Sequence, residues 1–265
     1  MSLHSGGLER HRALDARVRA ALRSDTRVTH ALAYGSFVQG TADRFSDLEY
    51  WAFLHPQAGT FDVRSWLEAL TPVQHFVVNE FGTPNAVVPG LLRIELHAVS
   101  NTQLADLRHW PGEHIFPDRM LIKDQDGQLL EQLEALEKKG LNPAREAQAL
   151  LDRTLNWLTF GLNVLARGER IRALELLWWV RANLLRLACL QSGHTAFWLN
   201  PSRLAEQRLP PELLERYRRL TVDLDGLEQA YTEALAWTAH LSGALALTTP
   251  ADLLAELRHA VQKGG

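Results

Sequence analysis

The stretch that decides the fold of this chain is Gly35-Ser36-Phe37-Val38-Gln39-Gly40-Thr41-Ala42-Asp43-Arg44-Phe45-Ser46-Asp47-Leu48-Glu49-Tyr50-Trp51-Ala52-Phe53-Leu54. Its second half is an apolar run with the pattern of a strand, and side chains alternate along a strand, so Asp47 and Glu49 should face the same side. Two carboxylates that close together repel each other unless a proton or a cation lies between them. A hard divalent ion with oxygen ligands is the cation that this pair favours.

The turn before this strand supplies a second functional element. Gly35 permits close approach of the backbone, and Ser36 can offer both a hydroxyl and a backbone N–H to a phosphate oxygen, the more so if it begins a short helix. The alternative is an ordinary turn followed by a strand with a solvated face. Trp51 and Phe53 oppose that alternative, because they share the face of the two acids. We therefore expect a phosphate cradle, Gly35 and Ser36, facing a metal site.

These residues resemble the signature of the DNA polymerase β-like nucleotidyltransferase superfamily, which is Gly-Ser, a spacer, then Asp-x-Asp or Asp-x-Glu on the next strand. The resemblance implies an α+β fold in which an N-terminal nucleotidyltransferase domain holds a mixed sheet with flanking helices. It also implies that Asp47 and Glu49 bind Mg²⁺ and that ATP or another nucleoside triphosphate is a co-substrate.

A third carboxylate is expected from the strand predicted at 91–99. Its apolar residues alternate with Arg93, Glu95 and His97. If this strand lies beside the strand of Asp47 and Glu49, Glu95 completes the acidic group, either as a ligand of a second metal ion, as the general base for an acceptor hydroxyl, or as both. The alternative is that these three polar residues only line a wet face of the sheet.

The triphosphate also needs positive charge. Arg44 lies next to the signature, and Lys123 lies on the last strand expected in the domain, so both are candidates to neutralise phosphate oxygens. The same role is open to arginines at 167, 170 and 172. For each of these residues the alternative is an ordinary surface charge.

The pattern of apolar residues predicts two domains, 1–140 and 141–265. In the first we expect helices at 8–22, 62–70 and 128–138 and strands at 28–34, 47–54, 75–79, 86–88, 91–99 and within 118–124. In the second, Asn142 is a plausible N-cap before Pro143, and leucines from Leu151 to Leu165 recur at steps of four and three. Such stripes predict a C-terminal antiparallel helical bundle.

Composition narrows the class of partner. The chain has 265 residues and a formal net charge of -3, which argues against general binding of long nucleic acids. Its single cysteine, Cys189, cannot form an internal disulfide, which is consistent with a reducing compartment. No signal peptide or membrane-spanning run is visible, so we expect a soluble, cytoplasmic protein without membrane contact.

Further motifs narrow the resemblance. They are Gly-Ser-Phe-x-x-Gly-x-x-Asp-x-x-Ser-Asp-x-Glu from Gly35, Asn79-Glu80-Phe81-Gly82-Thr83, Arg93-x-Glu95-x-His97, Gly161-x-Asn163-Val164-Leu165-x-Arg167-Gly168-Glu169 and Arg172-Ala173-Leu174-Glu175-Leu176-Leu177. Together they resemble the larger lincosamide nucleotidyltransferases over residues 10 to 260.

That resemblance implies Mg²⁺-dependent transfer of AMP from ATP to a lincosamide hydroxyl, assembly as a homodimer, and Glu95 as general base. The loops that would contact the acceptor match least closely. Three alternatives therefore stay open: an aminoglycoside acceptor, a protein hydroxyl acceptor, and a protein of this fold that binds nucleotide without turnover.

Overall fold

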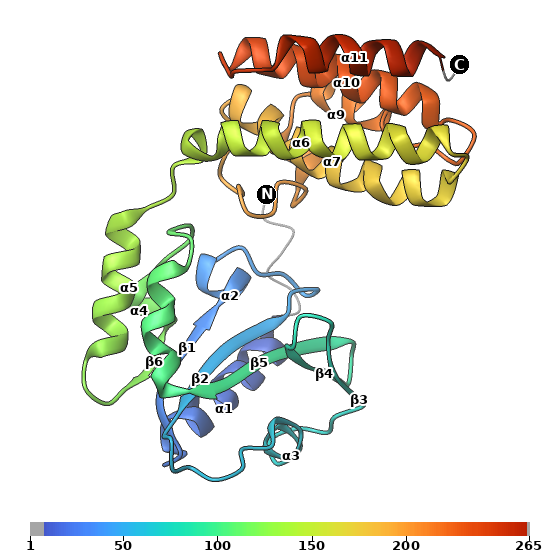
Figure 1. Ribbon diagram of the computed structural model, residues 1–265. Helices are drawn as coiled ribbons and strands as arrows, with labels where there is room; N and C mark the ends of the chain where they lie inside the picture. Colours follow the sequence, from blue (N-terminus) through green and yellow to red (C-terminus); the bar gives the residue numbers. More distant parts are fainter. Residues whose placement is uncertain (1–7, 264–265) are drawn as a thin grey trace. The chain divides into compact units, whose positions relative to one another are not determined.

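A six-stranded sheet organises the first part of the chain (Figure 1). In the order β3-β4-β5-β2-β1-β6, its strands are His75–Val78, Pro84–Val88, Leu92–Ser100, Leu48–Leu54, Val28–Tyr34 and Leu121–Asp124. The pair β2 and β5 is parallel, and the other neighbours are antiparallel. The computed structural model describes residues 8–263, and over this range the predicted α+β class with a mixed sheet is confirmed.

Helices flank this sheet. They are α1 (Glu9–Ser24), α2 (Gly35–Gln39), α3 (Val63–Glu68), the 3₁₀ helix η1 (Asn101–His109), α4 (Pro117–Met120) and α5 (Gln128–Lys139). The face of the sheet that carries Leu48 and Tyr50 packs against α1, where the Tyr50 hydroxyl donates to Asp15 at 2.6 Å. This face is apolar and sealed, so the acids predicted on the alternate positions of β2 lie on the opposite face.

Most elements of this part form where the sequence predicted them, and the differences have physical reasons. The 3₁₀ helix η1 was not predicted, because Asn101–His109 has only two buried apolar residues and no helical stripe. The helix after Phe116 is one turn long, followed at once by β6. Asn142 stands at the N-cap of the next helix, so the predicted position is confirmed. Its side chain makes no hydrogen bond to the helix, so the predicted capping interaction is absent.

The chain divides between Leu141 and Asn142 into two compact units. The second unit is helical: α6 (Pro143–Ala166), α7 (Arg170–Gln191), α8 (Ala205–Arg208), α9 (Pro211–Arg218), α10 (Leu227–Ala244) and α11 (Ala251–Lys263). The long helices α6 and α7 run antiparallel, and both pack against α10 (Figure 1). Their buried stripes, from Leu150 to Val164 on α6 and from Ala173 to Cys189 on α7, form the core of the bundle.

Gly161 of α6 lies against Tyr231 of α10. A Cβ atom at this position would lie 2.0 Å from the hydroxyl oxygen of Tyr231, which is buried and donates to Ala173 at 2.7 Å. Gly161→Ala should therefore destabilise the bundle by about 1–3 kcal/mol, the usual cost of overpacking a core. Gly243→Ala is the matched control, because nothing lies within 4 Å of a Cβ there. Thermal unfolding of both variants checks the prediction, and equal midpoints would contradict it.

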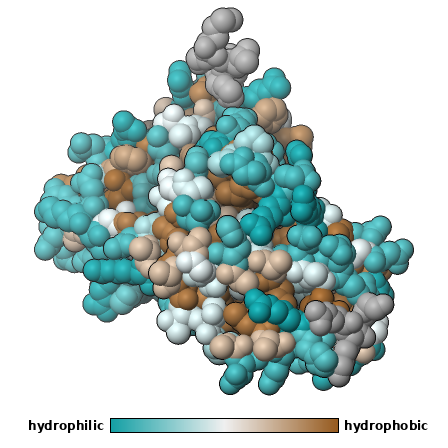
Figure 2. Space-filling view, turned by 90° about the horizontal axis from the view of Figure 1, so that it is seen from above, coloured by the Kyte–Doolittle hydropathy of each residue, from teal (hydrophilic) through white to brown (hydrophobic). Residues whose placement is uncertain are grey.

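The surface mixes polar and apolar side chains. Figure 2 shows a face that is mainly hydrophilic, with apolar side chains in separate patches between the polar ones. Large side chains that stay exposed include Trp178 and Trp179 on α7. Within residues 8–263, none of the helices combines the length and the apolar character that crossing a bilayer requires.

Candidate active site

A row of polar side chains crosses four strands on the open face of the sheet. The register pairs Tyr34 of β1 with Glu49 of β2, Glu49 with Glu95 of β5, and Glu95 with Asn85 of β4. Residues that face each other across neighbouring strands point to the same side of a sheet. Two of the three predicted acids are therefore direct neighbours, although they lie far apart along the chain.

Asp47 joins this row from the residue just before β2. Its carboxylate lies 3.2 Å from the Arg93 guanidinium, which is also 3.8 Å from Glu95. Partial burial raises the pKa of Asp47, the Glu95 charge raises it further, and Arg93 opposes both effects. The structure thus places Asp47, Glu49 and Glu95 on the same face of the sheet, with the Arg93 guanidinium near Asp47 and Glu95.

Glu95 is held by two neighbouring side chains. Its Oε1 atom accepts a hydrogen bond from the Tyr34 hydroxyl and lies 3.0 Å from Nε2 of His97. The hydrogen bond from His97 is the main reason that the pKa of Glu95 is below its usual range; burial opposes this effect, and the Tyr34 bond adds to it. The carboxylate is therefore ionised at neutral pH and able to accept a proton or a cation.

Gly35 and Glu49 are in close contact. A Cβ atom at Gly35 would lie 1.5 Å from Oε2 of Glu49, so only glycine leaves room for the carboxylate, and its φ of +75° also favours glycine. Ser36 follows as the second residue of α2 and is buried. The glycine-serine turn and the acids are therefore parts of one site. Contact of Ser36 with phosphate stays a prediction.

The two predicted cations are placed differently. Arg44 is exposed in the turn before β2, with its guanidinium 4.6 Å from the centre of the Phe45 ring, so its phosphate role stays a prediction. Lys123 pairs with Ala31 of β1, and its Nζ donates to the Asp25 carbonyl at 2.8 Å. Because Ala31 is an odd number of residues from Tyr34, Lys123 lies on the opposite face of the sheet. The structure does not bring Lys123 to the acids.

Sequence reasoning left three contributors without a role. Tyr34 ends the first strand, Arg93 and His97 were noted only as companions of Glu95, and all three now contact the acidic group. The available signal was alternation: each lies an even number of residues from an acid on its own strand, or directly opposite one. The alternation of side chains along a strand could not predict that β2 pairs with β5.

Aromatic rings form a wall beside Glu95. The Trp51 ring stacks on His97 with centroids 4.0 Å apart and an interplanar angle of 7°. Trp110, which follows η1, meets Trp51 edge-on at 5.4 Å and Tyr34 at 6.3 Å. These rings are only partly buried, so the wall offers a flat surface to a base or an acceptor as well as support for His97.

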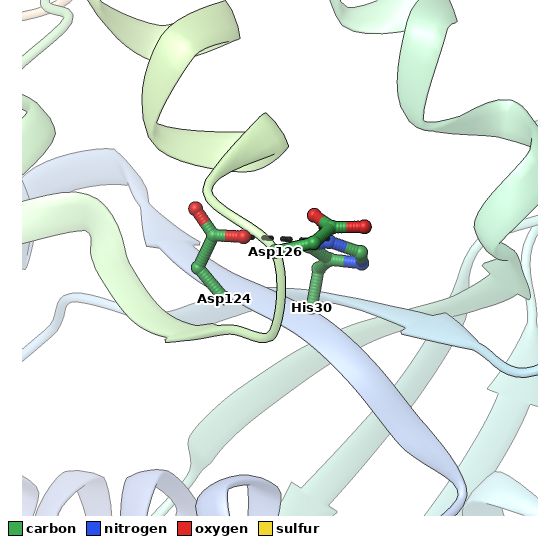
Figure 3. Close-up of side chains that lie close together, drawn as sticks. All are labelled: His30, Asp124 and Asp126. Atoms are coloured by element: carbon green, nitrogen blue, oxygen red, sulfur yellow. Dashed lines mark hydrogen bonds and ion pairs between the residues drawn. The ribbon is translucent and has the colours of Figure 1, made fainter.

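A second polar cluster occupies the β6 side of the same sheet. Figure 3 shows His30 of β1 with Asp124 and Asp126 from the end of β6 and the following turn. His30 Nε2 lies 2.9 Å from Asp126 and 3.4 Å from Asp124, and these three ligand atoms are close enough together to hold a metal ion. The sequence analysis did not identify this cluster, because its members come from separate strands and a turn.

The hydrogen bonds of this second cluster show that it also caps the N-terminus of α5. Asp124 accepts from the backbone N–H groups of Gly127 and Leu130, and Asp126 accepts from that of Gln128, at the start of α5. The mixed nitrogen and oxygen donors suit a zinc-like ion, whereas the all-oxygen set of Asp47, Glu49 and Glu95 suits Mg²⁺. The acidic group beside Gly35 is therefore the better match to nucleotide chemistry.

Comparison with known protein families decides the class of the second unit. Residues 144–259 match the family model described as "Lincosamide nucleotidyltransferase-like, C-terminal domain". The second unit is therefore similar to the C-terminal domain of lincosamide nucleotidyltransferases. For these residues, the match confirms the resemblance predicted from the sequence.

Three solved structures are similar to this chain at low sequence identity. An aminoglycoside 6-adenyltransferase from Bacillus subtilis is 16% identical, with 95% of this chain and 96% of that chain covered and a TM-score of 0.38. A nucleotidyltransferase-like protein from Exiguobacterium sibiricum 255-15 is 15% identical, with 97% and 89% covered and a TM-score of 0.41. A CCA-adding enzyme in complex with CTP is 13% identical, with 96% and 73% covered and a TM-score of 0.37. No curated protein matches the chain.

Proposed function

We propose that this protein is a nucleotidyltransferase that transfers AMP from ATP to a hydroxyl group of a small molecule of the lincosamide class, with Mg²⁺ as the cofactor. The observation that carries the proposal is the row of carboxylates beside the Gly35-Ser36 turn, in a chain whose second unit matches a lincosamide nucleotidyltransferase-like domain. The first unit is accordingly proposed to be the nucleotidyltransferase domain.

The acidic group fits a hard divalent ion. Asp47, Glu49 and Glu95 present only oxygen donors. Arg93 pairs with Asp47 and approaches Glu95, and its side chain is 47% exposed, which leaves it room to move aside. Bound Mg²⁺ would offset charge on phosphate oxygens as pyrophosphate leaves. When Mg²⁺ displaces Arg93 from the carboxylates, its guanidinium would be free to bind the negatively charged oxygens of the triphosphate.

Glu95 is proposed to accept the proton of the acceptor hydroxyl. As the acceptor oxygen forms its bond to the α-phosphorus, the bond to pyrophosphate breaks, and the hydroxyl proton passes to the Glu95 carboxylate. An ionised carboxylate is needed for this role, and the hydrogen bond from His97 keeps Glu95 ionised. The wall of Trp51, His97 and Trp110 is proposed to bind the flat part of a substrate.

The remaining assignments follow from the same proposal. The partner is a small-molecule acceptor rather than a nucleic acid, the location is the cytoplasm, and the enzyme acts as a homodimer in antibiotic resistance. Size-exclusion chromatography with light scattering tests the homodimer, and expression in a sensitive bacterial host with a drug-susceptibility assay tests the resistance.

Turnover with labelled ATP tests the proposed reaction. The purified protein, Mg²⁺ and lincomycin or clindamycin should yield labelled AMP-drug and pyrophosphate, both of which should disappear when EDTA is added. A panel of aminoglycosides and a cell lysate run in parallel distinguish the other acceptors. Transfer to an aminoglycoside or to a protein band would replace the lincosamide assignment, and ATP binding without pyrophosphate release on every acceptor would refute the reaction.

A further inference from the structure

Two neighbouring side chains hold the same oxygen atom of Glu95. The Tyr34 hydroxyl comes from β1, and His97 Nε2 comes from β5, two residues beyond Glu95 itself. A carboxylate only accepts hydrogen bonds, so His97 must carry its proton on Nε2 to donate here. Both donors act on Oε1, which leaves Oε2 on the side of Arg93, 3.8 Å away.

Both donors are themselves fixed. The Tyr34 ring lies 6.3 Å from the rings of His97 and Trp110, and His97 stacks on Trp51 at 4.0 Å. The Tyr34 hydroxyl must donate in this contact, because an ionised carboxylate has no proton to give. The two side chains that hold the Glu95 carboxylate are therefore themselves packed against aromatic rings.

We infer that Tyr34 and His97 are positioning residues for Glu95, which hold Oε1 so that Oε2 faces the acceptor hydroxyl and the metal. This inference rests on the proposed function, because it assigns to the two residues the orientation of the proposed base. The partners of a metal-binding or catalytic carboxylate typically affect activity or metal affinity 10- to 100-fold. Neither residue needs to contact the substrate for this effect.

Steady-state kinetics of three variants test the inference. Tyr34→Phe and His97→Ala should each lower kcat about 10- to 100-fold, while KM for ATP changes less than about threefold. His97→Gln places an amide N–H near the position of Nε2 and should restore part of the lost kcat. Tyr231→Phe is the matched control: it removes a buried tyrosine hydrogen bond in the helical unit, so it should lower the melting temperature and leave kcat unchanged.

A second measurement separates this inference from the proposed reaction. Mn²⁺ binding followed by electron paramagnetic resonance should show roughly tenfold weaker affinity in Tyr34→Phe and His97→Ala than in the parent protein. If the parent turns over and both variants keep its kcat, the positioning role is wrong although the function stands. If the parent turns over no acceptor, the function fails, and Mn²⁺ affinity decides: unchanged affinity in both variants overturns the positioning role as well.

Discussion

Asp47→Asn should abolish nucleotidyl transfer, with a loss of about a thousandfold or more, while the protein stays folded. A metal ligand contributes several kcal/mol to stabilising phosphate charge in the transition state, and each 1.4 kcal/mol corresponds to about tenfold in rate. The asparagine side chain has nearly the same shape but lacks the negative charge. Pyrophosphate release at saturating ATP and acceptor measures the effect.

The stability of Asp47→Asn should change little. The aspartate loses an ion pair with Arg93, but both side chains are partly exposed, 32% and 47%, so that pair contributes little. Asparagine also removes the repulsion between Asp47 and Glu95 that raises the pKa of Asp47. Asp106→Asn, on the exposed side of η1, is the control and should behave as the parent. Full activity of Asp47→Asn would remove Asp47 from the metal site.

Glu95→Gln should lower kcat by about 10²- to 10⁴-fold, the usual contribution of a general base, with a small change in KM for ATP. Glutamine suits this experiment because its amide oxygen can still accept from Tyr34 and His97, so the side chain stays in place and only its basicity is lost. The loss of kcat is measured at several pH values to show that it is not a displaced optimum.

A magnesium titration of Glu95→Gln separates its two possible roles. If Glu95 acts only as a metal ligand, high Mg²⁺ should restore turnover, because the variant is then limited by metal affinity. If Glu95 is the base, kcat stays low at saturating Mg²⁺. A variant with the kcat of the parent at ordinary Mg²⁺ would exclude both roles for this residue.

The sequence predicted the local part of this site well. The first strand at 28–34 forms as predicted, and β2 begins one residue after Asp47, because both segments are short, largely apolar runs next to turn-forming residues. The shared face of Asp47 and Glu49 follows from the alternation of side chains along any strand. Gly35 with a positive φ at the start of α2 follows from the need for a tight turn between strand and helix.

Three features of the structure depended on information outside the local pattern. Lys123 lies on the expected strand, but pairing of β6 with β1 opposite Ala31 turns its side chain to the α1 face, where it contacts Asp25. The 3₁₀ helix η1 brings Trp110 onto the acid face without any periodic signal. The cluster of His30, Asp124 and Asp126 likewise exists only because a strand and a distant turn meet.

By itself the sequence determined which residues alternate, where the chain turns, and that two carboxylates share one strand with a glycine-serine turn before it. Only the tertiary structure decided that β5 lies parallel to β2, which sets Glu95 opposite Glu49 and brings Tyr34, Arg93 and His97 to the acids. The physical reason is that periodicity fixes the face on which a side chain lies, whereas strand order and register depend on packing between segments that are remote in sequence.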